Sequence, residues 1–143
     1  MFGKNSINMK LKIFTDGGAR GNPGPAAIGI VIMDEAGKFL VKEGKYVGET
    51  TNNQAEYQAV VFALKKAKEL GGTELDFCLD SELVVKQLKG EYKVKNEELA
   101  HQFLKIWNLQ NQFKKVDYKH IYREGNKMAD KLVNDALDKK IKK

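Results

Sequence analysis

Four acidic residues stand at positions where folding alone does not require a charged side chain. Asp16 and Asp80 each close an apolar, alternating run typical of a β-strand, and Glu56 and Asp130 open stretches with helical periodicity. Ionised carboxylates that crowd together repel one another, so a cluster of them is sensible only if cations neutralise it. Ligands that are all oxygen suit Mg²⁺ or Mn²⁺, and two such ions can activate a water and stabilise the leaving oxygen of a phosphodiester.

Each of these acids also has an ordinary structural explanation. Asp is common before Gly in turns, and acids near helix N-termini are favoured by the helix dipole. The positions of the helical acids favour the chemical explanation: apolar residues follow at i+4 and i+7 from Glu56 and at i+3 and i+7 from Asp130. Both side chains are therefore expected to point inward, toward the same place as Asp16 and Asp80.

The elements that must position these acids form one predicted sheet. Strands are expected over residues 10–16, 26–33, 38–47, 75–80 and 116–123, and helices over residues 52–70, 82–88, 96–113 and 127–138. The first three strands form an antiparallel meander, and strands one, four and five, which helices separate, can be parallel neighbours. The prediction is an α/β fold with a five-stranded mixed sheet. Asp16 and Asp80 then lie at the carboxyl ends of adjacent strands, where open α/β sheets place their sites.

Composition narrows the class of protein. The chain has 143 residues and a net charge of +6, and residues 114–143 hold ten Lys or Arg against five Asp or Glu. A polyanionic partner such as nucleic acid is expected, and the alternative is a basic tail that only aids solubility. The single cysteine, Cys78, excludes an internal disulfide and a zinc site built from cysteines.

The chain is expected to form one domain over residues 1–143, with residues 1–9 as a flexible leader and residues 139–143 as a flexible basic tail. No apolar run approaches the roughly 20 residues of a membrane helix, and residues 1–8 carry no apolar signal region. A cytoplasmic monomer that does not associate with membranes is the expectation.

Amide side chains surround the predicted acid cluster. Asn52, Asn53 and Gln54 come shortly before Glu56, and Asn22 lies in the glycine-rich loop after Asp16. Amides both donate and accept, so they can bond base edges and sugar hydroxyls, and the 2′-hydroxyl is what separates RNA from DNA. For Asn52 the alternative is simple helix capping.

Together these segments resemble type 1 ribonuclease H (RNase HI). The resemblance rests on residues 15–25 (TDGGARGNPGP), 51–56 (TNNQAE), 79–81 (LDS) and 126–130 (NKMAD), in this order, and it spans about residues 11–137. It implies the RNase H-like fold and a metal-dependent endoribonuclease that hydrolyses the RNA strand of RNA–DNA hybrids. The implied products carry 5′-phosphate and 3′-hydroxyl ends.

Carried over position by position, the resemblance assigns the catalytic and metal-binding roles to Asp16, Glu56, Asp80 and Asp130, with Asp16 bridging two Mg²⁺ ions or, alternatively, Mn²⁺. The residues that it implies for hybrid binding are Gly17, Asn22, Asn52, Asn53, Gln54, Ser81 and Arg123.

The chain departs from many family members in two places. It lacks the histidine often found in the loop before the last acid, so Arg123 or Glu124 is the candidate to take over part of its role, while His120 in strand five is interpreted as structural. It also lacks the basic helical protrusion of some members, so hybrid grip is expected from Lys93, Lys95 and the C-terminal end, with a steep salt dependence.

Two other functions remain open from the residues. One is a binding module of the same fold that does not cleave, although such modules usually lose an acid and all four are present here. The other is a nuclease that also acts on double-stranded RNA, which displays 2′-hydroxyls in its minor groove as well.

Overall fold

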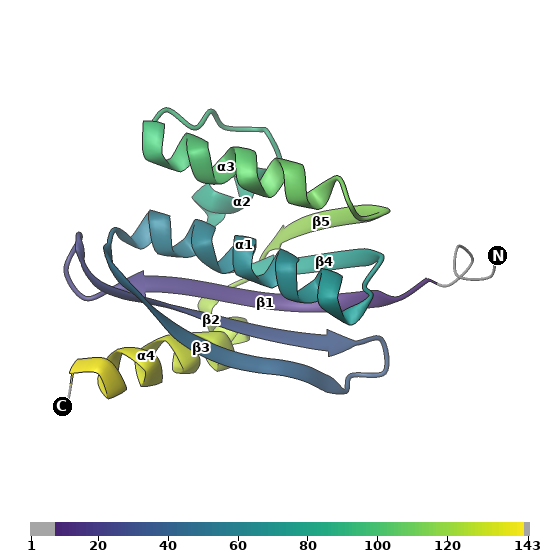
Figure 1. Cartoon of the computed structure of the whole chain (residues 1–143), viewed down its shortest axis with the longest axis horizontal. Helices are drawn as coiled ribbons and strands as arrows, with labels where there is room; N and C mark the ends of the chain where they lie inside the picture. The colour runs from purple at the N-terminus through teal and green to yellow at the C-terminus, as the bar shows by residue number, and fades with distance from the viewer. Residues whose placement is uncertain (1–7, 142–143) are drawn as a thin grey trace.

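A five-stranded mixed sheet forms the centre of the computed structural model, which describes residues 8–141 (Figure 1). Its strand order is β3-β2-β1-β4-β5; β1, β2 and β3 pair antiparallel, and β1, β4 and β5 pair parallel. The strands are β1 (Lys10–Ala19), β2 (Gly24–Asp34), β3 (Phe39–Thr50), β4 (Glu74–Leu79) and β5 (Lys115–His120). The predicted fold class is thereby confirmed.

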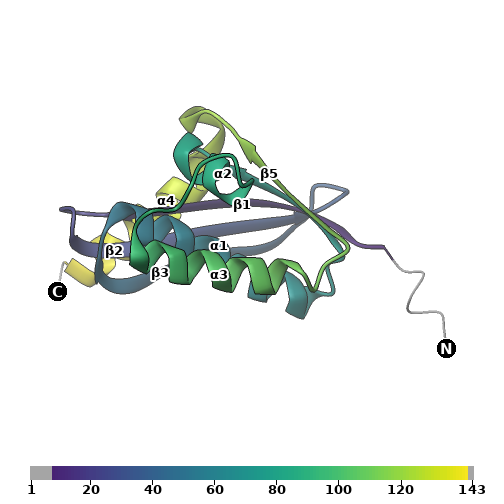
Figure 2. The ribbon, with the colours of Figure 1, turned by 90° about the horizontal axis from the view of Figure 1, so that it is seen from above.

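Helices cover both faces of this sheet. The helices are α1 (Asn52–Leu70), α2 (Glu82–Leu88), α3 (Glu97–Gln110) and α4 (Lys127–Ile141), and a 3₁₀ turn spans Arg123–Asn126. Helix α1 packs on β1 and β2 with α3 beside it, whereas α4 packs on β1, β2 and β3 from the opposite face (Figure 2). No helix within residues 8–141 combines the length and the apolar character needed to cross a membrane.

Helix α1 shows why the sequence folds as it does. The Thr51 hydroxyl accepts a hydrogen bond from the Gln54 N–H at 3.2 Å, and Gly71 ends the helix with a φ of 88°. Between these caps, alanines recur every four residues and are fully buried: Ala55, Ala59, Ala63 and Ala67. These small side chains let the helix approach the sheet closely, which places its first turn against the end of β1.

Several predicted boundaries differ from the observed ones, and for β1 and β5 the strand pairing supplies the reason. Strand β1 continues three residues past Asp16, because the two glycines and Ala19 stay paired with β2 instead of turning. Strand β5 ends at His120 rather than residue 123, because its partner β4 ends at Leu79 and offers no further pairing. Helix α3 ends at Gln110, not at residue 113.

Parts of the two ends that are expected to be flexible contact the fold or are helical. Met9 exchanges hydrogen bonds with Thr73, and Asn8 accepts one from the Lys114 ammonium at 3.3 Å, so these two residues are held in place. Helix α4 runs to Ile141, which makes the start of the predicted basic tail helical. The rest of the predicted leader and tail, residues 1–7 and 142–143, lies outside the described residues.

Candidate active site

Three carboxylates meet where β1, β4 and α1 come together. The parallel register pairs Phe14 with Cys78, and two residues further along each chain stand Asp16 and Asp80. One oxygen from each of Asp16, Glu56 and Asp80 lies within 4.8 Å of the other two. The predicted convergence of these three acids is confirmed, and their spacing allows one cation to contact all three.

Gly17 is what allows α1 to reach this point. A Cβ atom at Gly17 would collide with the backbone of Ala55, so β1 and α1 pack backbone against backbone here. The Gly17 N–H also forms hydrogen bonds with the carboxylates of both Asp16 and Glu56. The predicted site residue Gly17 thus sets the distance between two acids and supplies a donor to both.

The fourth acid approaches from the other face of the sheet. Asp130 lies in the first turn of α4, and its carboxyl hydrogen-bonds to that of Asp16. It stands outside the group of three oxygens that lie within 4.8 Å of one another. The arrangement is therefore a triad with one flanking acid attached through Asp16.

Crowding and burial shift the protonation of these acids. Burial, then the charges of Asp80 and Asp130, and a hydrogen bond with Asp130 raise the pKa of Asp16 to about 8, against the lowering effect of the Gly17 N–H. The pKa of Glu56 is well above its usual range, because of burial and the charges of Asp16 and Asp80; Gly17 and Arg123 oppose this shift. A cluster that is this costly to ionise fits a divalent cation bound by carboxylate oxygens.

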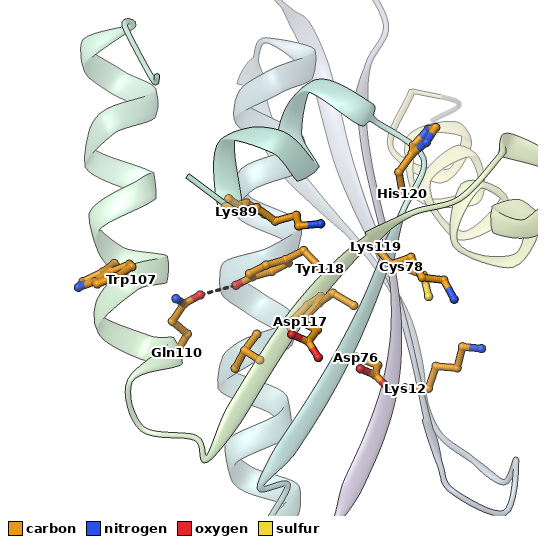
Figure 3. A pocket seen from close by; sticks show the side chains of 13 residues that line it. Lys12, Asp76, Cys78, Lys89, Trp107, Gln110, Asp117, Tyr118, Lys119 and His120 are labelled. Atoms are coloured by element: carbon orange, nitrogen blue, oxygen red, sulfur yellow. Dashed lines mark hydrogen bonds between the residues drawn. The ribbon is translucent and has the colours of Figure 1, made fainter. Parts of the chain in front are cut away.

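The acids line one cavity of about 320 Å³. Of the predicted site residues, its lining includes Asp16, Gly17, Asn52, Glu56, Asp80, Arg123 and Asp130. A larger hollow, of about 710 Å³, lies along β5 and contains none of the four acids (Figure 3). We assign the site to the smaller cavity, because the chemistry is concentrated there.

His120 belongs to the hollow along β5 and not to the acid cavity (Figure 3). Its side chain is exposed, and its ring stands edge-on to that of Tyr122 at 5.8 Å between centroids. His120 therefore lies outside the acid cluster, and its structural role stays a prediction. Of the two candidates to replace the missing loop histidine, Arg123 lines the acid cavity and Glu124 does not.

The remaining predicted substrate contacts all make internal hydrogen bonds, except Asn53, which is half-buried. Asn22 accepts from the Asn52 N–H at 2.9 Å, and Asn52 accepts from the Ala19 N–H at 2.7 Å, so the helix-capping alternative for Asn52 does not describe its side chain. Gln54 is buried and donates to Glu98 at 3.4 Å. Ser81 caps α2 by accepting from the Val84 N–H at 3.3 Å. Their role in substrate binding stays a prediction.

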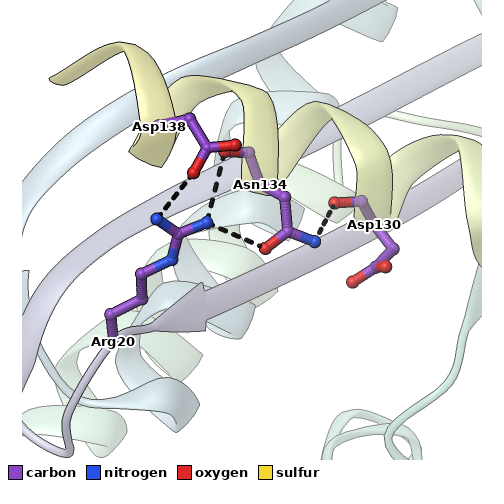
Figure 4. Close-up of polar contacts among 4 residues, drawn as sticks. All are labelled: Arg20, Asp130, Asn134 and Asp138. Atoms are coloured by element: carbon purple, nitrogen blue, oxygen red, sulfur yellow. Dashed lines mark hydrogen bonds and ion pairs between the residues drawn. The ribbon is translucent and has the colours of Figure 1, made fainter. Parts of the chain in front are cut away.

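Sequence reasoning missed two residues that support the site. Asn126, 1% exposed, donates to the Thr15 carbonyl at 2.9 Å and to Asp80 Oδ2 at 3.2 Å. Arg20 reaches from the end of β1 to Asn134 and Asp138 on α4 (Figure 4). Asn126 opens the segment 126–130 that carries the family resemblance, which was a signal for it, whereas only the tertiary structure reveals the partners of Arg20.

Comparison with known proteins agrees with this geometry. A family model described as "Reverse transcriptase-like" matches residues 14–136. The bifunctional protein Rv2228c of Mycobacterium tuberculosis is 41% identical over 131 residues, which are 91% of this chain and 36% of that protein. The chain therefore spans about a third of the length of this relative.

Two crystal structures are similar over nearly their whole length. RNase H1 of the archaeon Halobacterium salinarum is 37% identical with a TM-score of 0.89, covering 91% of this chain and 98% of its own. LC11-RNase H1, isolated from compost and crystallised in complex with RNA/DNA hybrid, is 46% identical with a TM-score of 0.88, covering 92% and 99%. With its fold, its acidic triad and these relatives, the chain belongs to the type 1 ribonuclease H family.

Proposed function

We propose that this protein is a metal-dependent endoribonuclease that hydrolyses the RNA strand of RNA–DNA hybrids and leaves 5′-phosphate and 3′-hydroxyl ends. The observation that carries the proposal is the group of Asp16, Glu56 and Asp80 oxygens within 4.8 Å of one another, in a chain of the ribonuclease H family. The complex of LC11-RNase H1 with RNA/DNA hybrid supports the choice of substrate.

Asp16, Glu56 and Asp80 would hold the metal, and Asp130 would complete the set. We propose two Mg²⁺ ions, with Mn²⁺ as the alternative. When bound, such ions supply positive charge for the phosphate oxygens and lower the pKa of water. The protein holds its acids ready for this: Gly17 donates to two of them, and Asn126 fixes the orientation of Asp80.

The polar residues around the acids would position the hybrid. Asn22 and Asn52 use their side-chain oxygens internally, which leaves their amide N–H groups as donors for sugar hydroxyls. Arg123 brings a positive charge to the cavity wall, where a phosphate would lie. Gly17, Asn53, Gln54 and Ser81 are retained in the proposed contact set from the family resemblance.

Outside the cavity, basic residues would bind the hybrid. Lys93 and Lys95 are exposed between α2 and α3, in place of a basic protrusion. Binding through a few lysines to phosphates should weaken steeply with salt. The cytoplasmic location and the monomeric state stay predictions.

The test is cleavage of an end-labelled RNA–DNA hybrid in Mg²⁺ by the natural chain and by Asp16→Asn. Internal cuts in the RNA strand, reduced at least about a thousandfold by the substitution, are expected, because the acid shared by the whole cluster is lost. Parallel assays with double-stranded RNA and double-stranded DNA of the same sequence separate hybrid specificity from the double-stranded RNA alternative. Hybrid binding without cleavage in either Mg²⁺ or Mn²⁺ would instead identify a binding module.

A further inference from the structure

We propose that Arg20 is a positioning residue that fixes the rotation of α4 and thereby the place of Asp130; this inference rests on the proposed function. The Arg20 guanidinium contacts three acceptors on α4. They are Asp138 Oδ1 at 2.8 Å, Asn134 Oδ1 at 3.3 Å and the Asn134 carbonyl at 3.5 Å (Figure 4).

The spacing of these partners links Arg20 to the site. Asp130, Asn134 and Asp138 are four residues apart, so they lie one above another on the same side of α4. The Asn134 amide also donates to the Asp130 carbonyl at 3.1 Å, as Figure 4 shows. The guanidinium contacts Asn134 and Asp138, which follow Asp130 on the same side of the helix. It thereby fixes the direction in which Asp130 points.

The residues around Arg20, 19–22, also contact α1, which is the other helix of the site. Ala19, next to Arg20, donates its N–H to Asn52 at 2.7 Å, and Asn22 accepts the Asn52 N–H at 2.9 Å. Residues 19–22 therefore join the start of α1, which carries Glu56, to α4, which carries Asp130. These contacts fix the position of α1 relative to α4, although the two helices lie on opposite faces of the sheet.

The packing beneath α4 explains why such a clamp is needed. The cross-strand pair Gly29 and Gly44 lies directly under the helix, where a Cβ would collide with the backbone of Ala129 or Leu132. These glycines allow α4 to approach the sheet closely, but they offer no side chains that would resist rotation of the helix. An exposed ion pair contributes little to stability by itself, so the value of Arg20 lies in orientation.

The kinetic test uses Arg20→Ala, Asp138→Asn and the double variant on RNA–DNA hybrid. Asp135→Asn is the matched control, because it breaks a 2.9 Å pair with Lys131 that lies wholly on α4 and away from the acid cavity. A shared positioning role predicts that each single change lowers kcat about fivefold to tenfold with KM changed less than about twofold, and that the double variant is no worse than the lower single one. Arg20→Lys should recover part of the loss, and the control should match the natural chain.

A direct substrate contact by Arg20 predicts a different pattern. In that case Arg20→Ala raises KM several-fold while Asp138→Asn, which frees the guanidinium, does not. This pattern, or additive losses in the double variant, would overturn the proposal.

Two readouts do not depend on cleavage. In metal-free protein, hydrogen exchange at the amides of residues 127–134 should speed up equally in Arg20→Ala and Asp138→Asn and stay unchanged in Asp135→Asn. Calorimetric titration with Mn²⁺ alone should give about tenfold weaker binding in the first two variants, as for other residues that orient metal ligands. Unchanged exchange and unchanged Mn²⁺ affinity in Arg20→Ala would refute the clamp, whether or not the natural chain cleaves hybrid.

Discussion

The side-chain amide of Asn126 joins Asp80 to the backbone of β1, with hydrogen bonds of 3.2 Å to Asp80 Oδ2 and 2.9 Å to the Thr15 carbonyl. This buried residue closes the 3₁₀ turn before α4. It thus connects the ends of two parallel strands to the element that leads into the helix of Asp130. The separation of Asp16 and Asp80 depends on this bridge as well as on the sheet.

Removal of this bridge should affect both stability and metal binding. We expect Asn126→Ala to lower the free energy of unfolding by about 1 to 3 kcal/mol, because the buried Thr15 carbonyl loses its partner. Asn126→Asp keeps the size but places a carboxylate against Asp80, so its stability should fall further in metal-free buffer. Urea unfolding and Mn²⁺ titration measure both effects. Asn108→Ala, at an exposed position on α3, is the control, and equal behaviour of all three chains would contradict the role of the bridge.

Two neighbouring glycines should respond differently to the same substitution. Gly17→Ala forces β1 away from Ala55, so we expect a loss of about 1 to 3 kcal/mol in unfolding free energy and a smaller thermal stabilisation by Mg²⁺. At Gly18 a Cβ meets only a Val133 methyl at 3.7 Å, an ordinary contact, and Gly18→Ala should change stability by less than about 0.5 kcal/mol. The measurement is the melting temperature with and without Mg²⁺. Similar losses in both variants would show that close approach at Gly17 is not the cause.

The raised pKa of Asp16 predicts how stability depends on pH without metal. Its pKa is about 8 in the folded protein against 3.8 as the ordinary value, so the folded state keeps a proton that the unfolded state releases. This contribution to stability is complete below pH 4 and is lost as pH rises from about 4 to 8. Glu56 acts in the same direction.

Asp16→Asn removes this titration and should therefore be more stable than the natural chain in EDTA at pH 8, with a smaller advantage at pH 5. Mg²⁺ at pH 8 should stabilise the natural chain and leave the variant almost unchanged, because binding requires the ionised acid. Thermal melts across pH, with EDTA or Mg²⁺, test both statements. A natural chain whose stability in EDTA relative to the variant is independent of pH would refute the assignment.

The loop before Asp130, which lacks a histidine, gives a prediction about the positive charge of Arg123. Arg123 lines the acid cavity and lowers the pKa of Glu56, so we expect Arg123→Ala to reduce kcat on RNA–DNA hybrid about tenfold or more, and Arg123→Lys to reduce it less. Glu124→Ala, one residue away and outside the cavity lining, should stay within about twofold of the natural chain. Single-turnover cleavage rates decide the matter, and a larger effect at Glu124 would reverse the assignment.

The order of the elements and the three triad acids were predictable because each depends on local periodicity and on the parallel pairing of neighbouring strands. The end of β1 was not, because glycines read as a turn; here they continue the strand with β2 and make room for α1. The end of β5 was missed because Ile121 and Tyr122 keep a strand-like pattern although β4 has no residue left to pair with them.

The supporting residues of the site were harder to predict than the acids. The partners of Arg20 lie 114 and 118 positions later in the chain, and no local pattern indicates contacts at that separation. Ser81 was identified as a substrate contact, and the bond that the structure shows for it is the cap of α2. Tertiary packing, not propensity, determines which polar side chains face the acids.

The position of α4 late in the described chain has a consequence during synthesis of the protein. Asp16, Glu56 and Asp80 are synthesised early, but Asp130, Asp138 and the apolar residues that cover Ala27 arrive only with the last helix. A growing chain on the ribosome therefore holds three of the four acids, yet one face of its sheet is bare and its last acid is missing. The fourth acid therefore joins the other three only when the helix that covers this face of the sheet has been made.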